Sequence, residues 1–165
     1  METVDQVVED RLLPGSGLSM VEYVHQVEQD KVGNQAAETR YIHWEDWVTN
    51  PARYWQEVTW WAYKAYLTRK ECYDIALKSG GEELAQDVWK ELTLDHREAN
   101  DDPNKNSPSA QADSPAKAVV WCIWDMPSKQ VIQIATGYVK APLATMAPPV
   151  NFDGFFPIPR PLQSS

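Results

Sequence analysis

The chain has 165 residues, of which 43% are hydrophobic, and its 24 acidic and 15 basic side chains give a formal net charge of −9. This length suffices for one domain with its own core, and the acidic balance argues against a basic face that would recognise a nucleic acid sequence. The two cysteines, Cys72 and Cys122, form no C-x-x-C pair, no apolar run is long enough for a membrane span, and the acidic N-terminus lacks the order of a signal peptide. We therefore expect a single domain, residues 1–165, in a cytoplasm, with reduced, buried thiols and no membrane contact.

The first part of the chain predicts an antiparallel pair of strands. After the turn signal Pro14-Gly15-Ser16-Gly17, apolar and polar residues alternate from Leu18 to Val27, as in a half-buried strand. Gln29 to Ala37 is polar and is predicted to be a loop or hairpin connection, and alternation resumes from Glu38 to Trp44. A turn is then expected at Asn50-Pro51.

The middle of the chain predicts a strand followed by a helix. Glu57 to Leu67 is apolar on both faces and rich in Val, Thr, Trp and Tyr, which favours a strand, with an amphipathic helix as the alternative. Thr68-Arg69-Lys70-Glu71 matches a capping box, in which the Thr68 hydroxyl and the Glu71 carboxylate each bond the other residue's amide. A helix should therefore begin at Arg69 and stop near Ser79-Gly80-Gly81, since glycine tolerates the left-handed closing conformation.

Two helical faces follow from the spacing of apolar residues. Tyr73, Ala76 and Leu77 are predicted to form the buried stripe of the first helix. Leu84, Val88 and Leu92 have the spacing of a second helix, which should end by Asp95 and has Ala85 and Trp89 beside its stripe.

The last third of the chain carries the strongest strand signal. Residues 96–116 have no large apolar side chain and are predicted to be a flexible polar insertion. Val119 to Asp125 and Val131 to Tyr138 are predicted to pair as a hairpin around the turn Met126 to Lys129, and residues 147–165 form a proline-rich exit segment. The predicted class is α+β: antiparallel strands and hairpins with one or two short helices.

The sequence offers weak candidates for catalysis or metal binding. His43 lies near Glu45 and Asp46, but the H-W-E-D spacing matches no metal-ligand pattern, and His25 and His96 lie far away in sequence. Adjacent carboxylates on a strand would point to opposite faces, so Glu45 and Asp46 make a poor acid/base pair. The chain also has no G-x-S-x-G elbow and no phosphate loop, so surface or edge histidines are the favoured interpretation.

Tryptophan is the unusual component, with 8 residues. The candidate set consists of Trp44, Trp47, Trp55, Trp60, Trp61, Trp121 and Trp124. Such residues most often fill a core, less often form an exposed protein interface, and least often form a sugar-stacking platform. Trp121 and Trp124 are three residues apart, so on a strand they would lie on opposite faces.

Four ordered stretches carry a family resemblance. They are D-R-L-L-P-G-S-G at 10–17 leading into V-E-Y at 21–23, Y-I-H-W-E-D-W at 41–47 with W-Q-E-V at 55–58 and Trp60, L-T-R-K-E at 67–71, and I-W-D at 123–125 with G-Y at 137–138 and G-F-F-P-I-P-R-P-L at 154–162. Taken together they resemble the portal protein of tailed phages with short tails (the podovirus type). The chain is similar to the middle, wing-like part of that family, which leads us to expect a fragment or truncated form. It departs from the family at Ser16, where Arg is frequent, and in the insertion 96–116.

The resemblance implies a structural role in the virion and in the host cytoplasm during assembly. Portal rings are gateways through which genomic DNA is packaged and ejected, at the head-tail connector. The implied partners are other portal subunits in a homo-oligomeric ring, terminase, capsid and tail proteins, and double-stranded DNA that passes without sequence recognition. The family implies no enzyme activity and no catalytic, cofactor-binding or metal-ligating residues. The alternatives are a stand-alone protein-interaction module and a glycan-binding domain built on the tryptophans.

Overall fold

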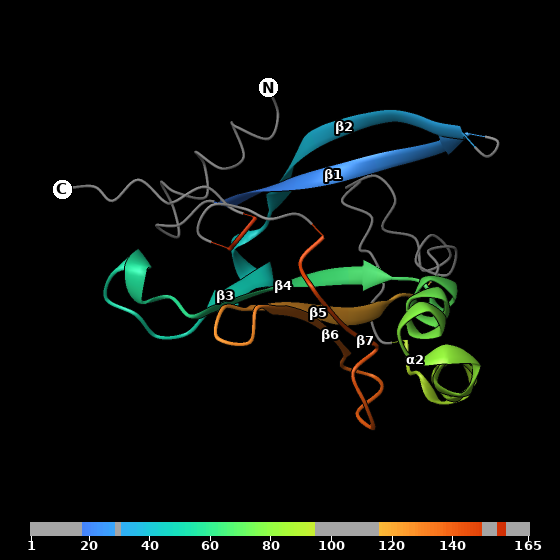
Figure 1. The fold of residues 1–165 in the computed structure, drawn as a ribbon. Helices are drawn as coiled ribbons and strands as arrows, with labels where there is room; N and C mark the ends of the chain where they lie inside the picture. Colours follow the sequence, from blue (N-terminus) through green and yellow to red (C-terminus); the bar gives the residue numbers. More distant parts are fainter. Residues whose placement is uncertain (1–17, 29–30, 95–115, 150–154, 158–165) are drawn as a thin grey trace, which may run out of the picture. The chain divides into compact units, whose positions relative to one another are not determined.

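The computed structural model describes residues 18–28, 31–94, 116–149 and 155–157 (Figure 1). Along the chain the elements are β1 (Leu18–Glu28), β2 (Lys31–Ile42), the 3-10 turn η1 (Trp44–Asp46), β3 (Trp47–Thr49), the 3-10 turn η2 (Trp55–Glu57), β4 (Trp60–Leu67), α2 (Arg69–Glu91), β5 (Ala118–Asp125), β6 (Gln130–Ala135) and β7 (Ala144–Met146). β1 and β2 form a two-stranded sheet, and the other strands form a sheet in the order β3-β4-β5-β6-β7. The predicted α+β class is thereby confirmed.

The chain divides into two compact units, residues 1–61 with 150–165, and residues 62–149. The assignment of residues 1–165 to a single wing-like domain stays a prediction.

The first unit contains the predicted antiparallel pair. β1 and β2 pair from Leu18 opposite Ile42 to Glu28 opposite Lys31, with a shift in register between His25 and Val27. The predicted loop or hairpin connection over 29–37 is wrong in its length, because β2 already begins at Lys31. Backbone N–H and C=O groups make the ladder whatever the side chains are, so a polar run need not interrupt a strand.

The end of β2 differs from the predicted strand end at Trp44. The strand ends at Ile42, because the Nδ1 atom of His43 accepts a hydrogen bond from the Glu45 amide (3.3 Å) and begins η1. The turn predicted at Asn50 is present and is held by the Asn50 side chain. Its Oδ1 atom accepts from the Thr59 amide (2.8 Å) and its Nδ2 atom donates to the Glu57 carbonyl (3.2 Å).

β4 confirms that a strand, not a helix, precedes the capping box. It begins at Trp60, because residues 55–57 form η2 in place of the first predicted strand residues. Trp61, Ala62 and Ala65 are buried, so both faces of the strand contribute to burial, as the sequence pattern predicted.

α2 begins at Arg69 with the predicted capping box. The Thr68 hydroxyl accepts from the Glu71 amide (3.3 Å), and the Glu71 carboxylate accepts from the Thr68 amide (2.7 Å). At Gly81 the backbone has φ 79° and ψ −172°, so the helix consists of two halves, residues 69–80 and 82–91, that turn against each other. Both predicted helices are therefore confirmed, and the second ends at Glu91.

The core of the second unit lies between α2 and the strands. Its buried members are Ala65, Cys72, Ala76, Ala85, Val88, Leu92, Ala118, Val120, Cys122, Ala135, Tyr138 and Leu143. The predicted stripe of the first helical half is correct at Ala76 and wrong at Leu77, which is 38% exposed. Cys72 takes the buried position instead: it lies four residues before Ala76, on the same helical face, so the buried face differs from the predicted stripe.

β5 and β6 confirm the predicted hairpin. Trp121 pairs with Ile134 and Asp125 with Gln130, around a turn over residues 126–129. β6 ends at Ala135 and not at Tyr138, because the chain turns over residues 136–137. The opposite orientation of the two tryptophans is also confirmed: Trp124 is buried, and Trp121 is half-buried with the Lys64 ammonium 5.4 Å from its ring centroid.

Two predicted segments fall largely outside the described residues. Of the polar insertion 96–116 the structure describes residue 116 alone, and of the exit segment 147–165 it describes residues 147–149 and 155–157. In the latter, Phe156 is buried and its ring centroid lies 6.0 Å from that of Trp55, within the first unit. The short strand β7 was not predicted.

Candidate functional site

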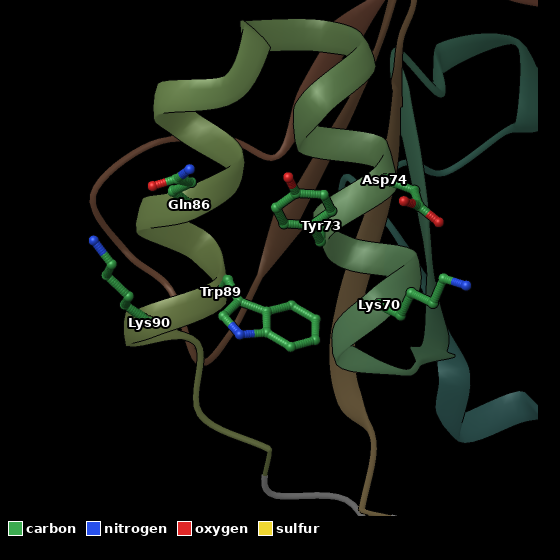
Figure 2. Close-up of a pocket in the computed structure, with 6 residues that line it drawn as sticks. All are labelled: Lys70, Tyr73, Asp74, Gln86, Trp89 and Lys90. Atoms are coloured by element: carbon green, nitrogen blue, oxygen red, sulfur yellow. The ribbon is translucent and has the colours of Figure 1, made fainter.

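A surface groove lies between the two halves of α2, within the second unit (Figure 2). We call it the α2 groove; its volume is about 460 Å³, and it is lined by Lys70, Tyr73, Asp74, Gln86, Trp89 and Lys90. The volume lies within the range of small-ligand and peptide-anchor pockets. The α2 groove is therefore the candidate site.

The glycine break at the tip of α2 creates the groove. A positive φ of 79° places Gly81 in the left-handed region, which glycine enters without a steric penalty. Tyr73 lies eight residues before Gly81 and Trp89 eight residues after it, so the two aromatic side chains lie level with each other when the halves fold back. Their ring centroids are 5.8 Å apart with an interplanar angle of 85°, an edge-to-face pair.

Hydrogen bonds hold the two helical halves together at both ends of the groove. At one end the Arg69 guanidinium donates to the Trp89 carbonyl (2.6 Å). Toward the other end the Glu82 carboxylate accepts from the Tyr73 hydroxyl (3.0 Å) across the halves, and also from the Gln86 side-chain amide (2.9 Å) within the second half. The bond to Glu82 raises the pKa of the Tyr73 hydroxyl, so this contact persists over the neutral range.

The rim of the α2 groove carries charges of both signs. Lys70 and Lys90 lie on either side of the Trp89 indole, and Asp74 lies farther along the first helical half (Figure 2). Within the described ranges neither lysine takes part in an ion pair. The Trp89 side chain is exposed, at 49%, so the groove combines an accessible aromatic surface with two available ammonium groups.

A second polar cluster joins α2 to the segment after β6. The Tyr138 hydroxyl donates to the Asp87 carboxylate (2.8 Å), and the Lys140 ammonium contacts Asp87 (3.3 Å) and Glu91 (2.6 Å). The Tyr138 hydroxyl holds the pKa of Asp87 below its ordinary value, and burial raises the pKa of Tyr138. The cluster fastens two elements through hydrogen bonds and ion pairs, so it is interpreted as structural.

Neither cysteine is placed for nucleophilic chemistry. Cys72 and Cys122 are both buried, as predicted, and neither is in a disulfide bond. Burial raises the pKa of the Cys72 thiol to about 11, so it carries its proton at neutral pH. Because the thiolate is the reactive form, Cys72 is inert in the folded protein.

The histidine and carboxylate candidates do not form a joint site in the described ranges. His43 and Glu45 are exposed at η1, where they make a turn contact, and His25 lies opposite Gln35 in the β1–β2 ladder. His96 lies outside the described residues. In the part of the chain that the structure describes, no three His, Cys, Asp or Glu side chains are grouped as metal ligands would be.

The predicted tryptophan set is divided between different environments. Trp61 and Trp124 are buried, while Trp44 is exposed at η1. Trp89, which lines the groove, did not belong to the set. The signal that would have found it is its symmetric spacing with Tyr73 about the Gly80-Gly81 break.

No protein-family model matches the chain, and no curated protein matches it either. Among the described helices, none has the length and apolar content needed to cross a membrane.

Proposed function

We propose that the chain is a structural component of a virion, akin to the wing-like part of a portal protein from short-tailed phages. The proposal rests on the ordered motif set, and one observation carries it further. Two stretches of that set, far apart in sequence, contact each other through the rings of Trp55 and Phe156, whose centroids are 6.0 Å apart. A contact of this kind is expected when the stretches form one structural unit.

The contact is supported by an adjacent aromatic pair. The rings of Phe155 and Phe156 lie 5.6 Å apart at an angle of 71°, and Phe155 has a positive φ of 73°. A positive φ is unfavourable for a bulky residue, so surrounding contacts must offset it. The F-F-P stretch therefore has a structural role: it fixes the backbone conformation at this point of the chain.

Three other residues of the motif set also have structural roles. Thr68 and Glu71 cap α2, and Gly137 allows close approach of the Thr93 backbone, with the Thr93 amide donating to the Gly137 carbonyl (3.1 Å). Residues that cap, turn and pack serve a scaffold. In this role the partners would be further portal subunits, terminase, capsid and tail proteins, and double-stranded DNA passing through the ring.

Protein mass spectrometry of purified, DNA-filled particles tests the proposal. Particles would be produced from the genome that encodes this chain and separated on a density gradient from free protein. We expect peptides of the chain to co-sediment with the particles in a fixed ratio to the major capsid protein. Filled particles that contain other head proteins but lack this chain would refute the proposal.

A further inference from the structure

We propose that the α2 groove is a docking site for a peptide segment that carries acidic residues beside a large apolar side chain. This inference goes beyond the structural role proposed above and does not depend on it. Three observations carry it: an aromatic pair in which Trp89 is exposed, two lysines without an ion pair in the described ranges, and hydrogen bonds that join the two helical halves around them.

The aromatic pair supplies the apolar part of the site. Trp89 is 49% exposed although Tyr73 packs edge-to-face against it, so much of the indole remains in contact with water. Burial of such a surface by a partner's apolar side chain is favourable. Tryptophan and tyrosine are also the residue types that most often dominate binding energy at protein interfaces.

The two lysines supply charge complementarity. Lys70 and Lys90 flank Trp89 from different helical halves, and both are exposed (Figure 2). Lys70 lies in the first turn of α2, where the helix dipole favours acidic residues, so the helix itself does not account for its charge. Carboxylates on either side of an apolar anchor would pair with both ammonium groups.

The frame of the site is already formed without a partner. The bond from Arg69 to the Trp89 carbonyl and the bond from Tyr73 to Glu82 both tie one helical half to the other. A pre-organised site loses little conformational freedom on binding. This favours recognition of a short segment by a few side chains.

A peptide fits the rim better than a nucleic acid does. Single-stranded nucleic acids also use aromatic stacking, but every nucleotide adds a phosphate. Here Asp74 lines the groove and Glu82 lies beside it, in a chain of net charge −9. A continuous anionic backbone would meet these carboxylates, whereas a peptide offers backbone amides to Asp74 and places its acidic side chains only at the lysines.

Fluorescence anisotropy with the full 165-residue chain tests the inference. The probe is a labelled synthetic peptide in which glutamates flank one leucine and one phenylalanine. A peptide with lysine in place of every glutamate and a labelled oligothymidylate serve as comparisons. We expect saturable binding of the acidic peptide that weakens with salt, and no saturation with the other two.

Matched variants locate the binding site. The double variant Lys70→Glu, Lys90→Glu should weaken the acidic peptide at least about tenfold, because both favourable pairs become like-charge contacts. Lys78 lies on the same helical half as Lys70 but outside the groove lining, so Lys78→Glu should leave the affinity unchanged. Trp89→Ala should weaken binding about thirtyfold, and Leu77→Ala, an exposed apolar residue outside the lining, should not.

Circular dichroism of each variant separates lost binding from lost folding, and the lysine variants change only exposed side chains. Absence of saturable binding, equal affinity for the acidic and basic peptides, or unchanged affinity in the lysine double variant would overturn the inference. Preferential binding of oligothymidylate would overturn it in favour of a nucleic-acid site.

Discussion

Thr68 shows how one side chain determines where α2 begins. Its hydroxyl accepts from the Glu71 amide, and the bonds that Glu71 accepts from Thr68 lower the pKa of that carboxyl below 4.5. We expect Thr68→Ala to reduce the free energy of unfolding by about 1 kcal/mol, measured by urea denaturation at neutral pH. Thr59→Ala, at an exposed loop position, is the matched control and should change it by less than about 0.5 kcal/mol.

The same pair predicts a pH dependence. A carboxyl whose folded pKa is lowered stabilises the protein above its unfolded pKa, and this contribution disappears as the pH falls through the folded pKa. The difference in stability between the wild type and Thr68→Ala should therefore be constant above about pH 5.5 and shrink below about pH 4. A difference that stays constant in acid would contradict the assigned role of Glu71.

Gly137 is a position where even one methyl group is excluded. A Cβ atom there would overlap the carbonyl oxygen and the backbone of Thr93, which a side-chain rotation cannot relieve. Gly137→Ala should therefore destabilise the protein by about 2–3 kcal/mol, read from the denaturation midpoint. In Gly81→Ala the added Cβ atom would meet no atom within 4 Å, but the φ of 79° is unfavourable for alanine. We therefore expect a smaller loss in the free energy of unfolding, about 1 kcal/mol. Comparison of the two variants separates backbone strain from steric overlap.

At the scale of elements, the Asp87–Tyr138 contact fastens the second half of α2 to the segment after β6. Asp87 has a lowered pKa, chiefly because of the Tyr138 hydroxyl, while the pKa values of Tyr138 and Lys140 are raised. The Asp87 contribution is lost as the pH falls through its folded pKa. The contributions of Tyr138 and Lys140 are lost as the pH rises through theirs.

Tyr138→Phe removes that contact and should lower the melting temperature most between about pH 5 and pH 9. The wild type loses the same contact as the pH falls through the lowered pKa of Asp87 or rises through the raised pKa of Tyr138, so the two proteins should converge at those extremes. Differential scanning calorimetry across pH checks the prediction. Tyr54→Phe is the control, because Tyr54 is 52% exposed. If it lowers the melting temperature as much as Tyr138→Phe does, the effect of removing the hydroxyl is nonspecific.

The elements that could be predicted are those encoded by local chemistry. The β5–β6 hairpin follows from the run of β-branched and aromatic residues that precedes its turn, and the start of α2 follows from the Thr68 cap. β7, with three residues, carries too short a pattern to be recognised, and the polar part of β2 is held by backbone pairing that composition does not encode. The groove depends on how two helical halves fold back at Gly81, a geometry that neither half encodes alone.

At the scale of the whole molecule, the dominant property is charge. Residues 1–50 hold 10 acidic and 3 basic residues, and the chain as a whole has an isoelectric point near 4.7. At neutral pH the resulting repulsion opposes nonspecific association of copies. Contacts between copies therefore become favourable when that charge is titrated.

Lowering the pH toward 4.7 should bring the net charge to zero and give a maximum of self-association, seen as light scattering, with clearer solutions on either side. Glu83→Lys, at an exposed position outside the groove, changes the formal net charge from −9 to −7 and should move that maximum to higher pH. Glu83→Asp keeps the charge and should leave the maximum in place. If the pH of maximum scattering is the same for Glu83→Lys and the wild type, a specific contact, and not net repulsion, controls association of this chain.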